Sequence, residues 1–246
     1  METRNRRRNE RSIPSHAPEP AVDDRTGTES PRGPKPLRLF IGIPLWEALC
    51  ESATPVEKQI RRIEGPLRWV KPERRHITLK FLGDCPASAL PGLEEALSSA
   101  VAQRPTFRIV VSGLGGFPRL SKARVLFVGV SEGREDLCAL AEAVDRGCLE
   151  AGLAGDRKKF QAHITLARSK AGAVGVRVPP EIHRAVWGEA EVGSVSLIES
   201  RLSSAGPEYR ILREFPLAPG DRRGSSSSRR PASTGDGLRL RRIVSG

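Results

Sequence analysis

The sequence predicts a fold of mixed strands and helices, built as an internal duplication whose two halves face one cleft. Three observations lead to this prediction. Strand-like alternation and helical periodicity follow one another along the chain, the tetrapeptide His-Ile-Thr-Leu occurs at 76–79 and again at 163–166, and other strand patterns recur at the same 87-residue step. A tetrapeptide can recur by chance, but a match with matched flanks at one offset indicates a duplication.

The folded part is expected to span residues 37–218. Residues 1–36 are rich in Arg, Pro, Ser and Glu and nearly lack apolar residues, and residues 219–246 are rich in Arg and Ser. Such segments are typically disordered, because they offer too little apolar surface to bury. We therefore predict a disordered N-terminal arm at 1–36 and a disordered basic C-terminal tail at 219–246.

The elements of the body follow in order. Alternation and short apolar runs predict strands at 37–44, 67–70, 76–82, 107–113, 125–130, 162–167, 191–199 and 209–217. Helical spacing of apolar residues predicts helices at 45–63, 87–102 and 135–151. Asp84 and Ser88 are candidate caps of the second helix. Glycines and a proline at 115–118 predict a loop after the strand at 107–113.

The duplication aligns the strands of the two halves. The step that carries His76 to His163 also carries Phe40 to Phe127, and it carries 107–113 onto 194–200. Each half therefore places its own His-x-Thr after a similar strand and helix. Two such halves predict a pseudo-two-fold arrangement in which both His-x-Thr strands face one cleft.

The net charge of +12 is spread over the arm, the body and the tail. The arm has eight Lys and Arg against six Asp and Glu, and the tail has seven Arg against two Asp, so they contribute +2 and +5 and leave +5 for the body. A moderately basic body with a basic tail suits a polyanion such as RNA. Basic tails are also common as solubilising segments, so the tail itself does not decide the partner.

The cysteines and the hydropathy indicate a cytoplasmic protein. Cys50, Cys85, Cys138 and Cys148 form no CxxC pair and have no zinc-ligand spacing with a histidine, so we expect free thiols. No apolar run is long enough for a membrane span or a secretory signal, which predicts no membrane contact.

Paired His-x-Thr motifs point to chemistry at phosphorus. Residues two apart on a strand share a face, so each histidine points the same way as its threonine. One neutral imidazole can take a proton from water while the other, protonated, gives a proton to a departing ribose oxygen. Threonine hydroxyls and the planar guanidinium of Arg168 can contact phosphate oxygens. The candidate site is therefore His76, His163, Thr78, Thr165 and Arg168.

Other interpretations of these motifs fit the residues less well. A lone histidine on a strand is more often a packed or surface residue than a catalyst, but two copies at matched positions favour function. A zinc site needs three or more protein ligands, and the other histidines are only His16, in the arm, and His183. We expect no metal and no cofactor. A non-catalytic RNA- or nucleotide-binding module stays an alternative, although binding alone needs no paired acid and base.

Three further features have two interpretations each. Phe117 can stack on a base or pack inside the protein. The basic residues Arg119, Lys122 and Arg124 can hold RNA or form a solvated face. Trp69 is expected in the core rather than at a site.

The motifs and their flanks resemble the 2H phosphoesterase superfamily, most closely its bacterial and archaeal RNA 2′,3′-cyclic phosphodiesterases, also called 2′-5′ RNA ligases. The resemblance covers roughly 37–218 and is carried by 38–44, 68–83, 113–118, 124–130, 160–168 and 197–209. It implies a bilobal α+β fold, each lobe an antiparallel sheet with helices on its outer face, and an active-site cleft between the lobes.

The resemblance also implies an activity. It implies metal-independent hydrolysis of RNA 2′,3′-cyclic phosphate ends to 2′-phosphate ends, with His76 as proton donor and His163 as proton acceptor. Thr78, Thr165 and Arg168 would bind the phosphate. The residues alone do not separate acid from base, since the two halves look alike. ATP-independent 2′-5′ RNA ligation at the same site stays an alternative, because a ribose hydroxyl can attack in place of water. The expected partner is RNA with such an end, a tRNA fragment or an oligonucleotide, and the expected state is a monomer.

Overall fold

The computed structural model describes residues 35–45, 58–60, 66–155, 159–203 and 206–220. Met1–Gly33 and Pro34–Gly246 are separate units, and every described residue lies in the second. Apart from the residues nearest the body, the predicted arm and tail lie outside the described residues. So does most of the helix predicted at 45–63: of its residues, Leu45 is described and not helical, and 58–60 are described and helical.

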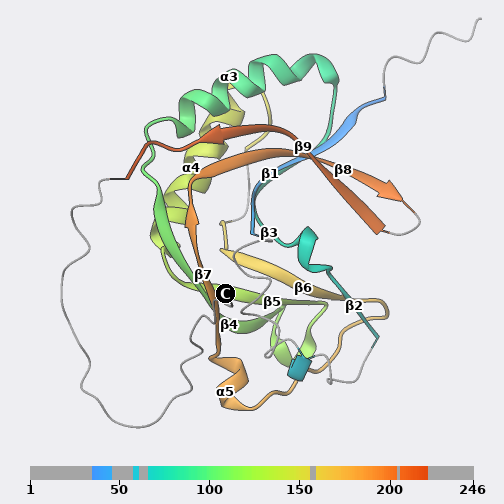
Figure 1. The fold of residues 1–246 in the computed structure, drawn as a ribbon. Coiled ribbons are helices and arrows are strands. Elements are labelled where there is room, and N and C mark those ends of the chain that lie inside the picture. The colour runs from blue at the N-terminus through green and yellow to red at the C-terminus, as the bar shows by residue number, and fades with distance from the viewer. Residues whose placement is uncertain (1–34, 46–57, 61–65, 156–158, 204–205, 221–246) are drawn as a thin grey trace, which may run out of the picture. The chain divides into compact units, whose positions relative to one another are not determined.

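The described strands form one curled, nine-stranded antiparallel sheet (Figure 1). Its order is β7-β4-β5-β6-β3-β1-β8-β9, and the short β2 pairs with β6. The strands are β1 (Leu37–Pro44), β2 (Leu67–Trp69), β3 (His76–Cys85), β4 (Phe107–Phe117), β5 (Val125–Glu132), β6 (His163–Ser169), β7 (Val186–Val192), β8 (Ser194–Ser203) and β9 (Gly206–Pro216).

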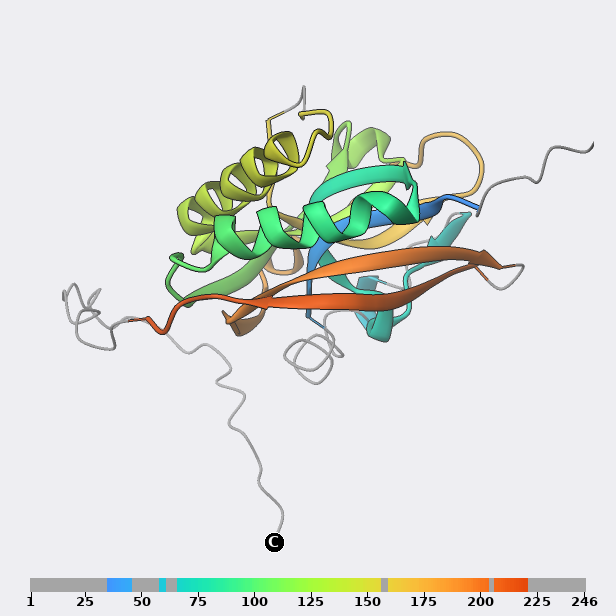
Figure 2. The same cartoon turned by 90° about the horizontal axis from the view of Figure 1, so that it is seen from above.

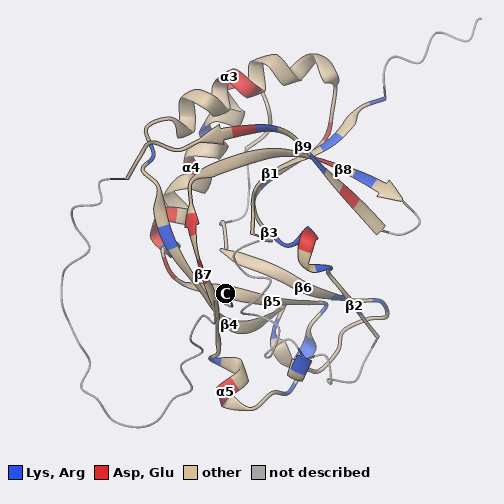
Figure 3. Cartoon of the chain, viewed as in Figure 1, with Lys and Arg blue, Asp and Glu red and all other residues tan. Residues whose placement is uncertain are grey.

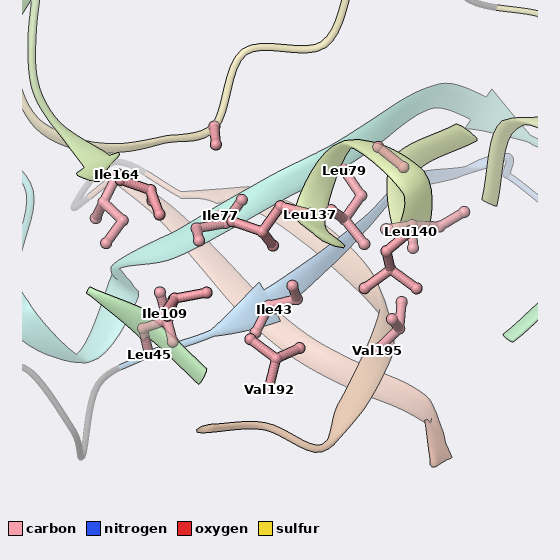
Figure 4. Packing of buried hydrophobic residues seen from close by; sticks show 14 of the residues in the cluster. Ile43, Leu45, Ile77, Leu79, Ile109, Leu137, Leu140, Ile164, Val192 and Val195 are labelled. Carbon is pink, nitrogen blue, oxygen red and sulfur yellow. The ribbon is translucent and has the colours of Figure 1, made fainter. Parts of the chain in front are cut away.

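The sheet divides into two lobes that meet where β3 runs beside β6. The first lobe is β3-β1-β8-β9 and the second is β6-β5-β4-β7. Among the described residues, β3 and β6 pair only through Ile77 and Ile164, and both side chains are fully buried on the core side of the sheet (Figure 4). The two-lobed α+β fold with antiparallel sheets is confirmed.

Each half of the duplication gives strands to the other lobe. The 87-residue step relates β1, β3 and β4 to β5, β6 and β8. In the sheet, however, β4 pairs with β5, and β8 pairs with β1. Each lobe is therefore built from both halves of the sequence, and neither half can complete its own sheet.

The helices of the described ranges are α3 (Leu90–Val101), α4 (Arg134–Glu150) and α5 (Pro180–His183), with 3₁₀ turns η1 (Pro72–Arg74), η2 (Ala87–Ala89) and η3 (Leu120–Lys122). α3 and α4 pack alongside each other (Figure 2) and contact β9 and β3 respectively. Buried Leu97 of α3 and Leu140 of α4 share one hydrophobic core with Ile77 and Ile164. These helices therefore pack on the face of β3 and β6 that carries the aliphatic side chains.

The loop predicted at 115–118 is wrong, because β4 continues through it to Phe117. The β4–β5 register shifts between Ser112 and Leu114, where Gly113 adopts a positive φ of 80°. A Cβ atom on Gly115 would overlap the Phe127 ring. These glycines therefore serve a bulge and a close approach between strands.

Two smaller predictions also need correction. The strand predicted at 191–199 is two strands, β7 and β8, separated at Gly193. Neither candidate cap bonds a helix end, because α3 begins at Leu90 directly after η2, and neither η2 nor α3 has a side-chain cap.

The expectations for the cysteines and Trp69 agree with the described residues. Cys85 and Cys138 are free thiols, Cys148 is buried, and Cys50 lies outside the described residues. Trp69 is partly buried against the core. Within the described part of the chain, no helix combines the length and the hydropathy needed to cross a membrane.

Candidate active site

Strands β3 and β6 present both His-x-Thr pairs on one face of the sheet. From the histidine onward, both strands show the same pattern, with His and Thr half-buried and Ile and Leu buried. Followed outward from the Ile77–Ile164 pair, the antiparallel register sets His76 across from Thr165 and Thr78 across from His163. We call the surface formed by these histidines and threonines the histidine face.

A bulge brings Arg168 to the histidine face. The register of β6 with β5 shifts between Thr165 and Ala167, so Leu166 and Ala167 are both buried and the next residue points back with the histidine. The guanidinium of Arg168 lies near enough to both imidazoles to help lower their pKa. The structure therefore brings this sequence-predicted arginine together with both histidines.

Each histidine is held by the same kind of backbone contact. His76 Nδ1 lies 2.9 Å from the carbonyl oxygen of Arg74, and His163 Nδ1 lies 2.8 Å from that of Gln161. A carbonyl oxygen can only accept, so Nδ1 carries the hydrogen and donates it. In the neutral ring Nε2 is then unprotonated, and it is the nitrogen left to exchange a proton with a substrate.

Two phenylalanines pack against His163 in the second lobe. The Phe117 and Phe127 rings are stacked with centroids 4.4 Å apart, and they approach His163 at 5.0 and 5.3 Å. Phe117 therefore packs within the protein, the second of its two interpretations. Gly115 is part of this arrangement, because its missing side chain leaves room for Phe127.

Phe40 and Tyr209 frame His76 in the first lobe. The Phe40 and Tyr209 rings lie 4.8 and 5.2 Å from the imidazole, with Tyr209 edge-on at 88°. Phe40 and Phe127 are related by the 87-residue step, but the second ring is a tyrosine in one lobe and a phenylalanine in the other. The 87-residue step showed that Phe40 and Phe127 match but not that each packs against a histidine. The contact of Tyr209 with His76 was not predicted, because Tyr209 lies on a strand far away in the sequence.

Burial lowers the pKa of both imidazoles. For His76 and for His163, loss of hydration is the largest cause, and the bond to a backbone carbonyl opposes it by favouring the protonated ring. The Arg168 cation lowers the pKa of both rings further, and His163 adds to the effect on His76. Without an anionic ligand, the site therefore favours two neutral histidines.

A cavity of about 410 Å³ lies beside His76, within the size range of small-molecule sites. Apolar residues of β8 and β9 and charged residues near η1 form its walls, namely Pro44, Glu73, Arg74, Arg75, His76, Ile198, Tyr209, Arg210 and Ile211. His163 and Arg168 do not line it. The cavity is therefore on the first lobe's side of the histidine face, whereas phenylalanine rings pack against the histidine of the second lobe.

The remaining sequence candidates lie elsewhere or take no defined part. His183 is exposed at the end of α5, and His16 lies outside the described residues. Within those ranges, no three His, Cys, Asp or Glu side chains are placed to hold a metal ion. Arg119, Lys122 and Arg124 are exposed around η3 and the start of β5.

The sequence was also compared with known proteins. It matches the 2′-5′ RNA ligase superfamily over residues 52–202. It is 35% identical over 189 residues to the RNA 2′,3′-cyclic phosphodiesterase of Aquifex aeolicus, covering 74% of this chain and 98% of the relative. It is 36% identical over 157 residues to the RNA 2′,3′-cyclic phosphodiesterase of Aeropyrum pernix, covering 62% of this chain and 88% of the relative.

Solved structures of the same kind share the fold. A crystal structure from Thermus thermophilus matches with a TM-score of 0.60 at 30% identity, covering 74% of this chain and 98% of that one. Escherichia coli LigT, solved with 3′-AMP, matches with a TM-score of 0.62 at 25% identity and the same coverage. The resemblance carried by the two motifs is confirmed: the chain belongs to the 2′-5′ RNA ligase superfamily of 2H phosphoesterases, in the RNA 2′,3′-cyclic phosphodiesterase family.

Proposed function

We propose that the protein hydrolyses 2′,3′-cyclic phosphate ends of RNA to 2′-phosphate ends with His76 as the acid and His163 as the base. The observation that carries the proposal is the pair of imidazoles on one sheet face, from two lobes, each with Nδ1–H bonded to a backbone carbonyl. The curated relatives support it, because they are named RNA 2′,3′-cyclic phosphodiesterases.

The reaction needs one proton taken and one given. Neutral His163 accepts a proton from water at Nε2 as the water oxygen attacks phosphorus. The bond from phosphorus to the ribose 3′ oxygen breaks, and protonated His76 donates its Nε2 proton to that oxygen. The product carries a 2′-phosphate and a free 3′ hydroxyl. Exchange with solvent then returns the proton from His163 and restores it to His76.

Three further side chains would bind the phosphate. Thr78 and Thr165 share the histidine face, and their hydroxyls can donate to the non-bridging oxygens, where negative charge grows in the transition state. The Arg168 guanidinium adds a fixed positive charge whose fork matches two phosphate oxygens. This set needs no metal ion, and we propose that none takes part.

The cavity beside His76 supports the choice of acid. The departing oxygen belongs to the ribose, so the acid must lie on the side where the nucleoside sits. The cavity has His76 on its wall but not His163. A nucleoside in this space places its 3′ oxygen toward His76 and leaves the other side of the phosphorus to water and His163.

The lowered pKa values fit these roles in different ways. A low pKa keeps His163 neutral, as a base must be. The acid His76 must be protonated although burial lowers its pKa. A bound phosphate anion beside the ring favours the imidazolium, so we expect substrate binding to raise the pKa of His76.

The test is turnover of the four nucleoside 2′,3′-cyclic phosphates by the full chain after exhaustive treatment with EDTA. We expect each to be opened, with a nucleoside 2′-phosphate as the sole product by ³¹P NMR. A 3′-phosphate product would contradict the choice of leaving oxygen. Activity that disappears with EDTA and returns with a divalent metal would contradict the metal-free mechanism. Tight binding without turnover would indicate a non-catalytic binding module.

The match to the 2′-5′ RNA ligase superfamily favours one second activity at the same site. A ribose 5′ hydroxyl in place of water would join two RNA ends through a 2′-5′ bond, with the same two proton transfers. Incubation with cleaved tRNA halves at high concentration separates the reactions. A joined product would show ligation, whereas 2′-phosphate ends alone would show that water is the nucleophile.

A further inference from the structure

Arginine side chains gather beside the histidine face. In the β2–β6 pairing, Arg68 lies directly opposite Arg168. Like charges opposite each other in a sheet normally destabilise it. Figure 3 marks Lys and Arg in blue between β2 and β3 as well, where Arg74 ends η1 two residues before His76.

The first residue of β9, Gly206, lies beside two of these arginines. A Cβ atom on Gly206 would overlap Arg68 Nη2 and lie 3.2 Å from Arg74 Nη1. Gly206 also has a positive φ of 106°, which other residues rarely adopt. Both guanidinium groups therefore lie over one glycine, close enough to contact a single phosphate.

The arginines continue from the histidine face to Gly206. Burial raises the pKa of the Tyr209 phenol, and the nearby cations of Arg168, Arg74 and Arg38 act against that rise in this order. Tyr209 itself touches His76 edge-on. Arg168 and Arg74 therefore both lie near Tyr209, and Arg68 lies opposite Arg168 and beside Arg74.

None of these arginines has a carboxylate partner in the described part of the chain. The ion pairs there engage other cations, including Arg108 with Glu132 and Glu189, and Arg201 and Arg210 with Glu199. A group of cations without counter-charges next to a phosphate site is what a second phosphate of the same chain would neutralise.

We propose that Arg68 and Arg74 bind the phosphate joining the terminal nucleotide to its 5′ neighbour, so that the site recognises an RNA chain rather than a cyclic mononucleotide. The inference rests on the proposed function and names the substrate class of the same site. The guanidinium forks at Gly206 supply contacts to the backbone without reading a base, so the preference for a chain is independent of its sequence.

The test compares two substrates that differ by one nucleotide, adenosine 2′,3′-cyclic phosphate and the dinucleotide ApA with a 2′,3′-cyclic phosphate end. In Arg68→Gln we expect kcat/KM for the dinucleotide to fall roughly 10- to 100-fold, the loss expected for a hydrogen bond to a charged group. We expect kcat/KM for the mononucleotide to stay within about twofold. Arg108→Gln is the matched control, because Arg108 is exposed but paired with carboxylates, and it should change neither value.

Salt dependence gives a second measurement that needs no variant. For the native chain, a plot of log kcat/KM against log salt should be steeper for the dinucleotide, because salt screens the additional contact between phosphate and guanidinium. Equal slopes would overturn the proposal, as would an equal loss on both substrates, or no loss on either, in a folded Arg68→Gln variant.

Failure of the proposed function gives a different result. If the native chain opens neither substrate, that function is wrong, and binding then decides the role of Arg68. The native chain should bind ApAp more tightly than 3′-AMP, and Arg68→Gln should remove most of this preference. A preference that is absent, or unchanged in the variant, would overturn the role of Arg68.

Discussion

The bond from Nδ1 to a backbone carbonyl fixes which nitrogen of each histidine is left for a substrate. Both carbonyls come from the residue two positions before the histidine, so the sequence holds this feature twice. The bonds oppose the effect of burial on each pKa. They also hold the ring orientation, which proton transfer requires.

Replacement of Arg168 should shift the pH dependence of the reaction. The Arg168 cation lowers the pKa of both imidazoles, so Arg168→Gln should raise both. In the bell-shaped profile of kcat/KM, the acidic limb reports the base and the alkaline limb the acid. Both limbs should therefore move to higher pH while the maximum falls. A profile with unmoved limbs, measured with a cyclic mononucleotide, would show that Arg168 does not act on the histidines.

Gly115→Ala should displace the Phe127 ring that packs against His163, and so lower both stability and activity. The added Cβ would overlap the Phe127 ring, which packs against His163. Overpacking of this kind costs about 1–3 kcal/mol of the free energy of unfolding, and kcat should fall with it. Gly92→Ala in α3 is the control, because its Cβ would meet nothing within 4 Å. Similar melting temperatures and kcat values for the two variants would contradict this role of Gly115.

Local pattern was enough to find the proposed site residues but not their neighbours. His76 and Thr78 follow from the period of two in a strand, as do His163 and Thr165. The identity of the rings around them depends on which strands lie side by side, which no short window of sequence shows. Arg68 was not a sequence candidate for the same reason, since its position opposite Arg168 comes from the pairing of β2 with β6.

At the scale of elements, strand pairing explains where the sequence succeeded and failed. Periodicity located most strands and the helices α3 and α4 to within a few residues. It placed a loop inside β4 because glycine can serve a bulge or a close approach as well as a turn. It joined part of β7 to β8 because one glycine separates two apolar runs. β4 pairs in the lobe of the second half and β8 in the lobe of the first. This pairing depends on tertiary contacts, and no short stretch of sequence predicts it.

The Ile77–Ile164 pair should govern how the two histidines are spaced. Both side chains are fully buried where the lobes meet. Ile164→Ala should cost about 2–5 kcal/mol of unfolding free energy and also lower kcat, because the lobes lose packing next to the site. Leu97→Ala removes an equally buried side chain of α3 and should cost similar stability without lowering kcat. Equal kcat values, measured well below both melting temperatures, would contradict this role.

For the whole molecule, the body should be sufficient for catalysis. The Aquifex relative is covered over 98% of its length by 74% of this chain, and every proposed site residue lies between 35 and 220. A chain of residues 35–220 should therefore open cyclic mononucleotides with kcat/KM within about twofold of the full chain. It should also elute as a monomer in size-exclusion chromatography, since one chain supplies every proposed group. A large loss of mononucleotide turnover would show that the arm or the tail takes part in the site.

The central claim is that His76 and His163 are a paired acid and base, and the pH profile of each alanine variant tests it most directly. Each substitution should lower kcat/KM for a cyclic mononucleotide by roughly 10²- to 10⁴-fold. The residual activity of His76→Ala should lose the alkaline limb, and that of His163→Ala the acidic limb. If His76→Ala lost the acidic limb and His163→Ala the alkaline limb, the acid and base roles would be reversed. Full activity in either variant would contradict the account.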